Sequence, residues 1–501
     1  MDIKHGPGND KPNFHLSGWI PLRKRLGDIL SAKPLTCLPM DFASDVAKKM
    51  QDNKRSAVIV TAFSGKAIGI VTEKDFVDKI ASAGDFNQNR RAHEIMSSPL
   101  ISLRPEDFSY RALMLMLNFR IGHVAVTDSH DVLLGVIALK DFFSGDSSNV
   151  LTLVDKINAL DSLSDLVWTG LEIDTILQAM LDERAFGSEI CALVTELYDL
   201  LIGKIIILAE NELKAKGLNA PPGGYCFINM GSAGRMEQFT RTDQDNGIIY
   251  ADPGPGETET AAEYYHNLGR IIVKALEESG FSRCPGDVMA ENRAWCKPLS
   301  LWKTDVDRWS QTLDPQSVRD LTIFLDFRCV SGKRELYDEL KLYTLNIFKN
   351  SEHALQFLAE DDLNHRVPIN LFRRVISSGL HPQRRRLNLK NSAMVHMVDC
   401  IRVFALREGI NETNTFARLS RLKELKVFRR AEADFLAAAY ENLMLMRIKN
   451  AARQINLGSE RDNYIDIKDL DKNDQILLKE SLNIANRLQT LVMHTFHVHK
   501  A

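Results

Sequence analysis

The stretch YCFINMGSAGRMEQFTRTDQDNGIIY, residues 225–250, indicates the fold of the larger part of the chain. Apolar runs at 225–230 and 246–250 predict two short strands. A glycine-rich turn, residues 231–235, follows the first strand directly. Glycine has no side chain to keep the backbone away from a phosphate, and N–H groups at a helix start attract an anion. The turn therefore predicts phosphate contacts at Gly231 and Ser232. Arg235, at the end of the turn, is a further candidate for phosphate contact, and the alternative for it is capping or a local salt bridge with Glu237.

Two aspartates precede the second apolar run. Residues two positions apart on a strand face the same side, so Asp243 and Asp245 are expected to project together. Two neighbouring carboxylates repel each other unless a cation neutralises them, and Mg²⁺ prefers carboxylate and phosphate oxygens. The pair predicts a site for Mg²⁺ (or Mn²⁺) that holds a nucleoside triphosphate. The alternative interpretation is a polar turn before a strand.

A third carboxylate lies further along the chain, in residues 321–330. This segment reads as a nearly continuous apolar strand that Asp326 and Arg328 interrupt. A charge buried among apolar residues is costly unless a partner or a metal compensates for it. We expect Asp326 to be the third metal ligand and Arg328 to contact phosphate. The alternative is a buried ion pair on a core strand.

An internal repeat occupies the first part of the chain. A shift of 66 positions aligns Asp28-Ile29 with Glu94-Ile95, and Gly69 with Gly135. The same shift aligns residues 74–76 with 140–142, both of which read Lys-Asp-Phe. Each copy predicts a helix, two short strands and the start of another helix.

The repeated strand-to-helix turns resemble those of a tandem pair of cystathionine-β-synthase-type (CBS) domains, over residues 22–146. The resemblance implies that Thr72 and Asp75 contact a ribose, and that AMP, ADP or ATP binds between the copies. The second copy keeps Asp141, but Ala138 takes the place of the hydroxyl residue. The alternative is a purely architectural dimerisation module.

The later motifs resemble the DNA polymerase β nucleotidyltransferase superfamily. They are most similar to the nucleotidyltransferase domain that follows CBS pairs in bacterial signal-transduction proteins, which is itself similar to protein-PII uridylyltransferases. The motifs that carry the resemblance are Gly231-Ser232-x-Gly234-Arg235-x-Glu237-Gln238, Thr242-Asp243-Gln244-Asp245-Asn246, Asp326-Phe327-Arg328, Leu389-Lys390, Asp399-Cys400-Ile401-Arg402 and Arg418-Leu419. The resemblance implies metal binding by Asp243, Asp245 and Asp326, with Asp326 as the base. It also implies nucleotidyl transfer to a protein or small-molecule acceptor.

Together these patterns predict an α+β multidomain chain. The expected parts are an N-terminal extension (1–21), the CBS pair (22–146), a helical linker region (150–216), a polymerase-β-like nucleotidyltransferase domain (217–334) and a C-terminal helical bundle (335–501). The segment from residue 225 to about 330 reads as rich in strands. In the last part, we expect helices near 336–349, 393–408, 415–425, 431–450 and 474–494.

Composition narrows the class of function. The net charge of -3 gives no support to nucleic-acid or membrane binding. The seven cysteines form no CxxC pair and no zinc-like spacing, which favours a reducing cytoplasm. CBS pairs often pack as dimers, so the resemblance also implies a homodimer.

Two functions remain open from the sequence. The first is a nucleotidyltransferase that adenine nucleotide regulates through the CBS pair. The second is a catalytically inactive protein that senses nucleotide or binds a partner. A nucleic-acid-directed polymerase is a weaker third hypothesis, because the chain has no basic stripe.

Overall fold

The computed structural model describes residues 24–30, 34–82, 89–119, 121–143, 149–163, 165, 169–311, 315–363, 367–368, 386–459 and 461–498. The chain divides into two compact units, Met1–Thr152 and Leu153–Ala501, and each is described by itself. The predicted N-terminal extension lies outside the described residues. None of the described helices combines the length and the apolar character that a membrane span requires.

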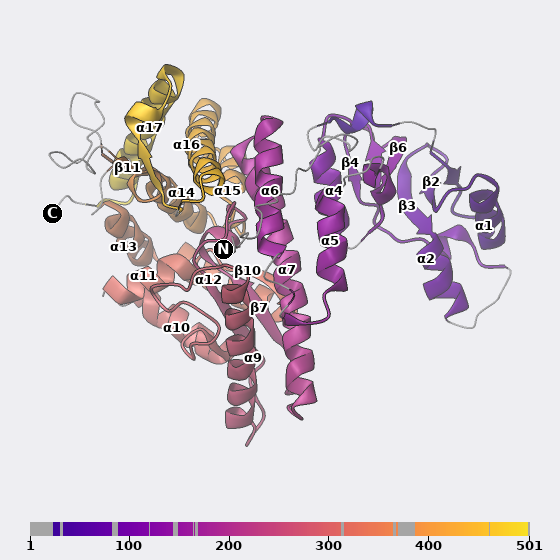
Figure 1. Ribbon diagram of the computed structural model, residues 1–501, viewed down its shortest axis with the longest axis horizontal. Helices are drawn as coiled ribbons and strands as arrows, with labels where there is room; N and C mark the ends of the chain where they lie inside the picture. The colour runs from indigo at the N-terminus through magenta and orange to yellow at the C-terminus, as the bar shows by residue number, and fades with distance from the viewer. Residues whose placement is uncertain are drawn as a thin grey trace, which may run out of the picture. The chain divides into compact units, whose positions relative to one another are not determined.

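The first unit consists of two similar small sheets with helices beside them (Figure 1). In each sheet the first pair of strands is parallel and the second pair is antiparallel. The first sheet contains β1 (Thr36–Cys37), β2 (Ala57–Thr61) and β3 (Ala67–Thr72), and the second contains β4 (Ser102–Leu103), β5 (His123–Thr127) and β6 (Leu133–Ala138). The helices are α1 (Ala43–Asp52), α2 (Glu73–Phe76), α3 (Ala92–Ile95) and α4 (Ser109–Phe119).

The equivalent glycines of the repeat, Gly69 and Gly135, lie where each copy packs against the other. A Cβ atom added to Gly69 would come within 2.6 Å of Sδ of Met96, which belongs to the second copy. A Cβ atom on Gly135 would collide in the same way with the side chain of Leu30, from the first copy. Leu30 and Met96 are also 66 positions apart, so each copy makes the equivalent contact with the other. The repeat is therefore a symmetric pair, and its glycines allow this close packing.

The second unit is built around a four-stranded sheet with the order β10-β7-β8-β9. Its strands are β7 (Tyr225–Asn229), β8 (Asn246–Tyr250), β9 (Cys296–Pro298) and β10 (Arg328–Gly332). The pairs β10–β7 and β7–β8 are antiparallel, whereas β8 and β9 are parallel. Every residue of β7 and β8 is buried, so the two predicted strands form the centre of the sheet.

Helices surround this sheet. The long α7 (Gly187–Ala215) packs along α9 (Thr258–Glu278), and Figure 1 shows the two running side by side. The helices before the C-terminal part are α5 (Asn149–Ala159), which spans the division between the units, α6 (Thr169–Asp182), α8 (Gly231–Gly234), α10 (Leu299–Gln311), α11 (Pro315–Phe324) and α12 (Arg334–Lys349).

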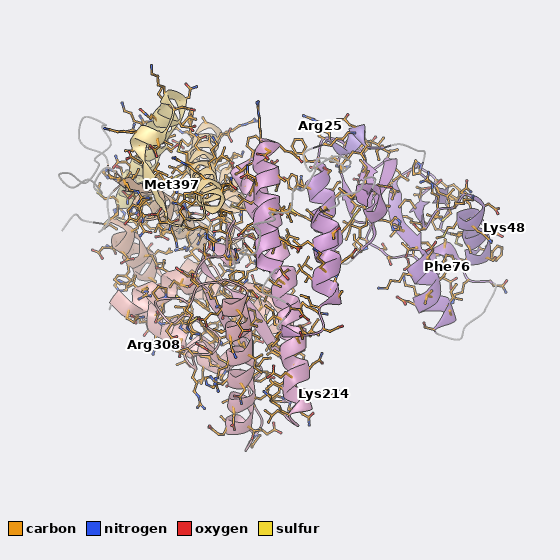
Figure 2. The ribbon with its side chains drawn as sticks, viewed as in Figure 1. Arg25, Lys48, Phe76, Lys214, Arg308 and Met397 are labelled. Atoms are coloured by element: carbon orange, nitrogen blue, oxygen red, sulfur yellow. The ribbon has the colours of Figure 1, made fainter. Side chains whose placement is uncertain are left out.

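The C-terminal part is helical, as predicted. It contains α13 (Glu352–Leu363), α14 (Val395–Arg407), α15 (Thr415–Glu424), α16 (Arg430–Asn456) and α17 (Lys472–Thr495), with a small pair of strands, β11 (Arg386–Asn388) and β12 (Tyr464–Asp466). Helix α17 packs against both α14 and α16. Met397 of α14 is fully buried there, among the helices at the yellow end of the chain (Figure 2).

The prediction of a strand-rich segment from 225 to about 330 is wrong, because three helices (α9, α10 and α11) occupy much of it. The predicted strand over 321–330 is also wrong in its first half. Val318, Leu321 and Leu325 are buried at helical spacing, so this apolar run forms one face of α11 and its end. Strand β10 begins only at Arg328, and Asp326 lies in the turn before it.

An aromatic cluster fixes this turn against the sheet. The ring of Phe324 stacks on Trp302 at 5.4 Å and on Phe327 at 4.5 Å between centroids. The indole N–H of Trp302 donates to the carbonyl oxygen of Ile248, on β8, at 3.1 Å. The packing of these fully buried rings therefore sets where Asp326 lies relative to the sheet.

Candidate functional site

One edge of the four-stranded sheet gathers the predicted site segments. Asn229, the last residue of β7, pairs with Asn246 at the start of β8 and with Arg328 at the start of β10. The glycine-rich turn leaves this edge after β7, and Asp245 immediately precedes β8. The sheet register therefore brings together segments that are almost a hundred residues apart.

The glycines of the turn permit two close approaches. Gly231 has a φ of +55°, and a Cβ atom there would come within 2.6 Å of the Oδ2 atom of Asp245. A Cβ atom on Gly234 would collide with the backbone carbonyl oxygen of Asp326. A larger side chain at either position would force the turn away from these aspartates, so the two glycines are needed for the shape of the site.

A single pocket contains most of the residues predicted for the nucleotidyltransferase site. It is lined by Gly231, Ser232, Arg235, Asp243 and Asp245. The same pocket is also lined by side chains from the C-terminal helical part, namely Lys390, Asp399, Arg402 and Arg447. The sheet edge and the helical part therefore form one site, to which both contribute charged groups.

The aspartate pair faces this pocket without a cation of its own. Among the described residues, no ion pair involves Asp243 or Asp245. Burial raises the pKa of Asp245, the Cys284 thiol donates a hydrogen bond to its carboxylate, and the Lys390 ammonium acts against the rise. Two carboxylates that lack a salt bridge and share a pocket are oxygen donors suited to a divalent cation.

The structure contradicts the prediction for Asp326. Its side chain is fully buried, and three guanidinium groups surround its carboxylate. Arg402 donates to Oδ1 at 3.1 Å and to Oδ2 at 2.6 Å. Arg418 lies 2.8 Å from Oδ1, and Arg235 donates to Oδ2 at 2.7 Å.

These arginines hold the pKa of Asp326 well below its usual range, although its burial acts in the opposite direction. Both oxygens are already engaged, so Asp326 is unsuited to bind a metal or to accept a proton. Within the described part of the chain, no group of three or more His, Cys, Asp or Glu side chains is arranged to hold a metal ion. The buried ion pair, which the sequence left open as the alternative, is the better description.

The surroundings of Arg328 give no support to the predicted phosphate contact. Arg328 forms an ion pair with Asp199 of α7 at 2.7 Å, and it donates to the carbonyl oxygen of Ala233 at 2.9 Å. It is not among the residues that line the pocket. Arg328 therefore links the glycine-rich turn to α7 from outside the pocket.

Two cations of the pocket were missed as site residues. The side-chain ammonium of Lys390 has no hydrogen-bond or ion-pair partner among the described residues, and burial lowers its pKa. The guanidinium of Arg447 donates to Asn463 at 2.7 Å and contacts the sulfur of Met394, but no described carboxylate pairs with it. Leu389-Lys390 was one of the resembling motifs, whereas nothing in the sequence singled out Arg447.

Asp399 and Arg402 belong to a motif that carries the resemblance, but no role in the site was predicted for them. They lie one turn apart on α14, and Arg402 donates to Oδ1 of Asp399 at 2.7 Å. Burial raises the pKa of Asp399 to about 6. Besides the aspartate pair, the pocket thus has the carboxylates of Glu237 and Asp399, and neither is the residue expected as the third ligand.

In the first unit, Thr72 and Asp75 form the expected turn. Thr72 caps α2, and its hydroxyl donates to Oδ2 of Asp75 at 2.6 Å. The other oxygen of Asp75 accepts from Lys79 and from Ser97, each at 2.8 Å. In the second copy, Asp141 accepts from the backbone N–H of Ala138 at 2.8 Å. The two aspartates thus hold equivalent turns, and only the first has a hydroxyl partner at the capping position.

Family comparisons match three parts of the chain. Residues 26–82 and 92–147 match the CBS domain. Residues 171–316 match the family described as "Putative nucleotidyltransferase DUF294". Residues 352–496 match the family described as "Putative nucleotidyltransferase substrate binding domain". The match to residues 171–316 begins within α6, so it includes α7 and most of α6, which lie in the segment predicted as a helical linker region (150–216).

Individual relatives match a smaller share of the chain. An uncharacterised protein of Methanopyrus kandleri is 26% identical over 132 residues, which are 26% of this chain and 67% of that protein. The mitochondrial CBS domain-containing protein CBSX3 of Arabidopsis thaliana is 32% identical over 111 residues, which are 21% of this chain and 53% of that protein.

Solved structures also match about a quarter of the chain. A CBS domain protein from Pyrobaculum aerophilum, complexed with AMP, is 24% identical with a TM-score of 0.22, and covers 24% of this chain and 89% of its own. A structure described as a "putative signal-transduction protein with CBS domains" from Burkholderia ambifaria is 28% identical with a TM-score of 0.23, and covers 24% of this chain and 91% of its own.

Proposed function

We propose that this chain transfers a nucleotidyl group from a nucleoside triphosphate to an acceptor. The proposal is supported by the matches of residues 171–316 and 352–496 to the two nucleotidyltransferase-related families, with a CBS pair before them. The acceptor is a protein or a small molecule with a hydroxyl group. The observation that carries the proposal is the charge arrangement of the pocket. Among the described residues, neither Asp243 nor Asp245 forms a salt bridge, and the same holds for Lys390 and Arg447, which line the same pocket.

The donor set of the aspartate pair fits magnesium or manganese. Mg²⁺ usually binds through one or two carboxylates together with substrate phosphates and water, so a third protein carboxylate is not required. Asp243 and Asp245 would hold the cation. When bound, it would neutralise charge on the phosphates and activate the attacking oxygen.

The remaining pocket residues would bind and orient the triphosphate. Ser232 and the backbone of the glycine-rich turn lie beside the aspartate pair, and the positive φ of Gly231 keeps the turn close to Asp245. Arg235 is held in place by Glu237 and Asp326, both at 2.7 Å. Lys390 and Arg447 approach the same pocket from the helical part. Cations fixed before the substrate arrives stabilise phosphate charge without further reorganisation.

Replacing Lys390 by alanine is expected to weaken triphosphate binding by about 10- to 100-fold, the loss of one charge-assisted contact of roughly 1.5–3 kcal/mol. Lys390→Arg should recover part of the affinity, because it keeps the charge. Titration with a fluorescent triphosphate analogue in the presence of Mg²⁺ measures the effect. The control is Lys214→Ala, an equal change of charge on an exposed part of α7. Equal affinities of Lys390→Ala and the control would remove Lys390 from the binding site.

The proposed activity can be tested with the intact protein. The protein is incubated with each of the four α-³²P-labelled nucleoside triphosphates, Mg²⁺ and a cell lysate as the source of acceptors, with and without a chelator. We expect one triphosphate to give a labelled product that disappears when the metal is removed. No metal-dependent labelling with any triphosphate would contradict the transfer reaction and would favour the inactive nucleotide-sensing protein instead.

We also propose that an adenine nucleotide regulates the protein at the first CBS copy. Both oxygens of Asp75 already accept hydrogen bonds, so a ribose hydroxyl has to replace the bond from Thr72 or one of those from Lys79 and Ser97. Calorimetric titration with AMP, ADP and ATP should detect binding to the wild type and loss of binding in Asp75→Ala. Asp141→Ala, the matched change in the second copy, should have the smaller effect. The absence of heat with all three nucleotides would contradict the regulatory role.

A further inference from the structure

The pocket contains four carboxylates, and the hydrogen-bond partners of each one indicate what it does. Asp243 and Asp245 are the pair proposed for the metal. Glu237 is fully engaged, since it accepts from Arg235 and from the Tyr440 hydroxyl at 2.7 Å and from the Thr415 N–H at 2.8 Å. The bonds from Thr415 and Tyr440 fasten the segment after the glycine-rich turn to α15 and α16. Asp399 is the remaining carboxylate of the pocket.

Asp399 is held rigidly while one of its oxygens stays available. Its Oδ1 atom accepts from Nη1 of Arg402 at 2.7 Å, whereas its Oδ2 atom has no hydrogen-bond partner among the described residues. Arg402 is itself fixed, because its Nε and Nη2 atoms bind the two oxygens of Asp326. Asp326 thus positions Arg402, and Arg402 positions Asp399. A carboxylate with a fixed orientation and a free oxygen is suited to proton transfer.

We propose that Asp399 is the general base that accepts the proton of the acceptor hydroxyl, an inference that rests on the proposed transferase function. As the acceptor oxygen forms its bond to the α-phosphorus, the bond between that phosphorus and the bridging oxygen to the β-phosphate breaks. The hydroxyl proton passes to Oδ2 of Asp399, and pyrophosphate leaves with the electron pair of the broken bond. The C-terminal helical part then supplies the base, whereas the sheet edge supplies the metal-binding pair.

The charged groups around Asp399 agree with this role. They are Arg402 on its own helix, Asp362 on α13, Asp326 before β10 and Arg235 after α8. Burial and the two neighbouring aspartates raise the pKa of Asp399 to about 6, while the two arginines oppose the rise. The carboxylate is therefore ionised at neutral pH and is a stronger base than an ordinary aspartate. The transfer rate is expected to fall as the pH decreases through this value, because protonation removes the base.

The first variant is Asp399→Asn, which keeps an oxygen acceptor for Arg402. In the labelled-transfer assay, the rate should fall by about 10²- to 10⁴-fold, the usual contribution of a general base. The acid limb of the pH–rate profile should disappear, while affinity for the fluorescent triphosphate analogue should stay unchanged. The control Asp434→Asn changes an exposed aspartate of α16 in the same way and should leave rate and profile as in the wild type.

The second variant is Asp399→Ala, which opens space for a small external base. Added formate should restore part of its transfer rate, a response that a purely structural role would not give. If Asp399→Asn transferred at the wild-type rate and kept the acid limb of the pH–rate profile, the role of Asp399 would be overturned and the proposed function would stay intact. A loss of triphosphate affinity in both variants, without rescue by formate, would show that Asp399 only shapes the pocket. The absence of metal-dependent transfer in the wild type would overturn the proposed function and this inference together.

Discussion

Replacing Asp326 by asparagine is expected to lower the free energy of unfolding of the second unit by about 3–5 kcal/mol. The carboxylate of Asp326 is the common partner of the guanidinium groups of Arg235, Arg402 and Arg418. An amide keeps the size of the side chain but removes the negative charge. Three buried cations would then lie together without their shared anion, and their repulsion would act in a region with little access to water.

Thermal unfolding followed by calorimetry measures this effect, and Asp434→Asn serves as the control. Asp434 forms exposed ion pairs with Lys423 and Arg430, and pairs of this kind contribute only about 0–1 kcal/mol. If Asp326→Asn lost activity while its unfolding temperature stayed unchanged, the structural role would be contradicted and the original hypothesis of a third metal ligand would be restored.

The stabilisation by Asp326 should also depend on pH. The pKa of Asp326 is lowered in the folded protein, so folding favours the ionised carboxylate. Its contribution is present above the ordinary pKa of an aspartate in the unfolded chain, and it is lost as the pH falls towards the lower folded value. The difference in stability between the wild type and Asp326→Asn should therefore shrink in acid. A difference that did not vary with pH would argue against the charge as its cause.

Replacing both Asp243 and Asp245 by asparagine is expected to reduce nucleotidyl transfer by at least about 10³-fold. Metal catalysis of this kind contributes several kcal/mol, and each 1.36 kcal/mol corresponds to a factor of ten in rate. Folding should be preserved, because burial disfavours the ionised form of Asp245 and the amide removes that cost. The labelled-transfer assay measures the rate, and calorimetry measures the stability.

Asp434→Asn is again the matched control, with one exposed carboxylate removed and the pocket untouched. Transfer by the double variant at the wild-type rate would show that the pair does not hold the metal. The two predictions with the largest effects can thus be told apart by comparing stability with the transfer rate. Loss of Asp326 should affect mainly stability, whereas loss of Asp243 and Asp245 should affect mainly turnover.

Local patterns were sufficient to predict a large part of the architecture. The constant shift of 66 positions defined the tandem pair, and the structure explains it through reciprocal contacts of Gly69 and Gly135. The runs at 225–230 and 246–250 became the central strands β7 and β8, which are buried at every position and polar only at the paired Asn229 and Asn246. The C-terminal helices followed from three- and four-residue spacing.

The role of Asp326 could not be predicted in the same way, because the groups that decide it are distant in the sequence. Arg402 and Arg418 belong to helices that begin about seventy and ninety residues later along the chain. The apolar run before Asp326 fits a strand as well as a buried helix, and only its packing against Trp302 resolves the choice. Lys390, Asp399 and Arg447 enter the site for the same reason, through tertiary packing of the helical part.

The most direct test of the central claim is a titration of Mn²⁺ binding by electron paramagnetic resonance in the presence of a non-hydrolysable triphosphate. The wild type and the Asp243→Asn/Asp245→Asn variant are compared at the same protein concentration. Our account predicts that the wild type binds Mn²⁺ together with the nucleotide and that the variant does not. Equal Mn²⁺ binding by the two proteins would contradict the assignment of this pocket as a metal-dependent nucleotide site.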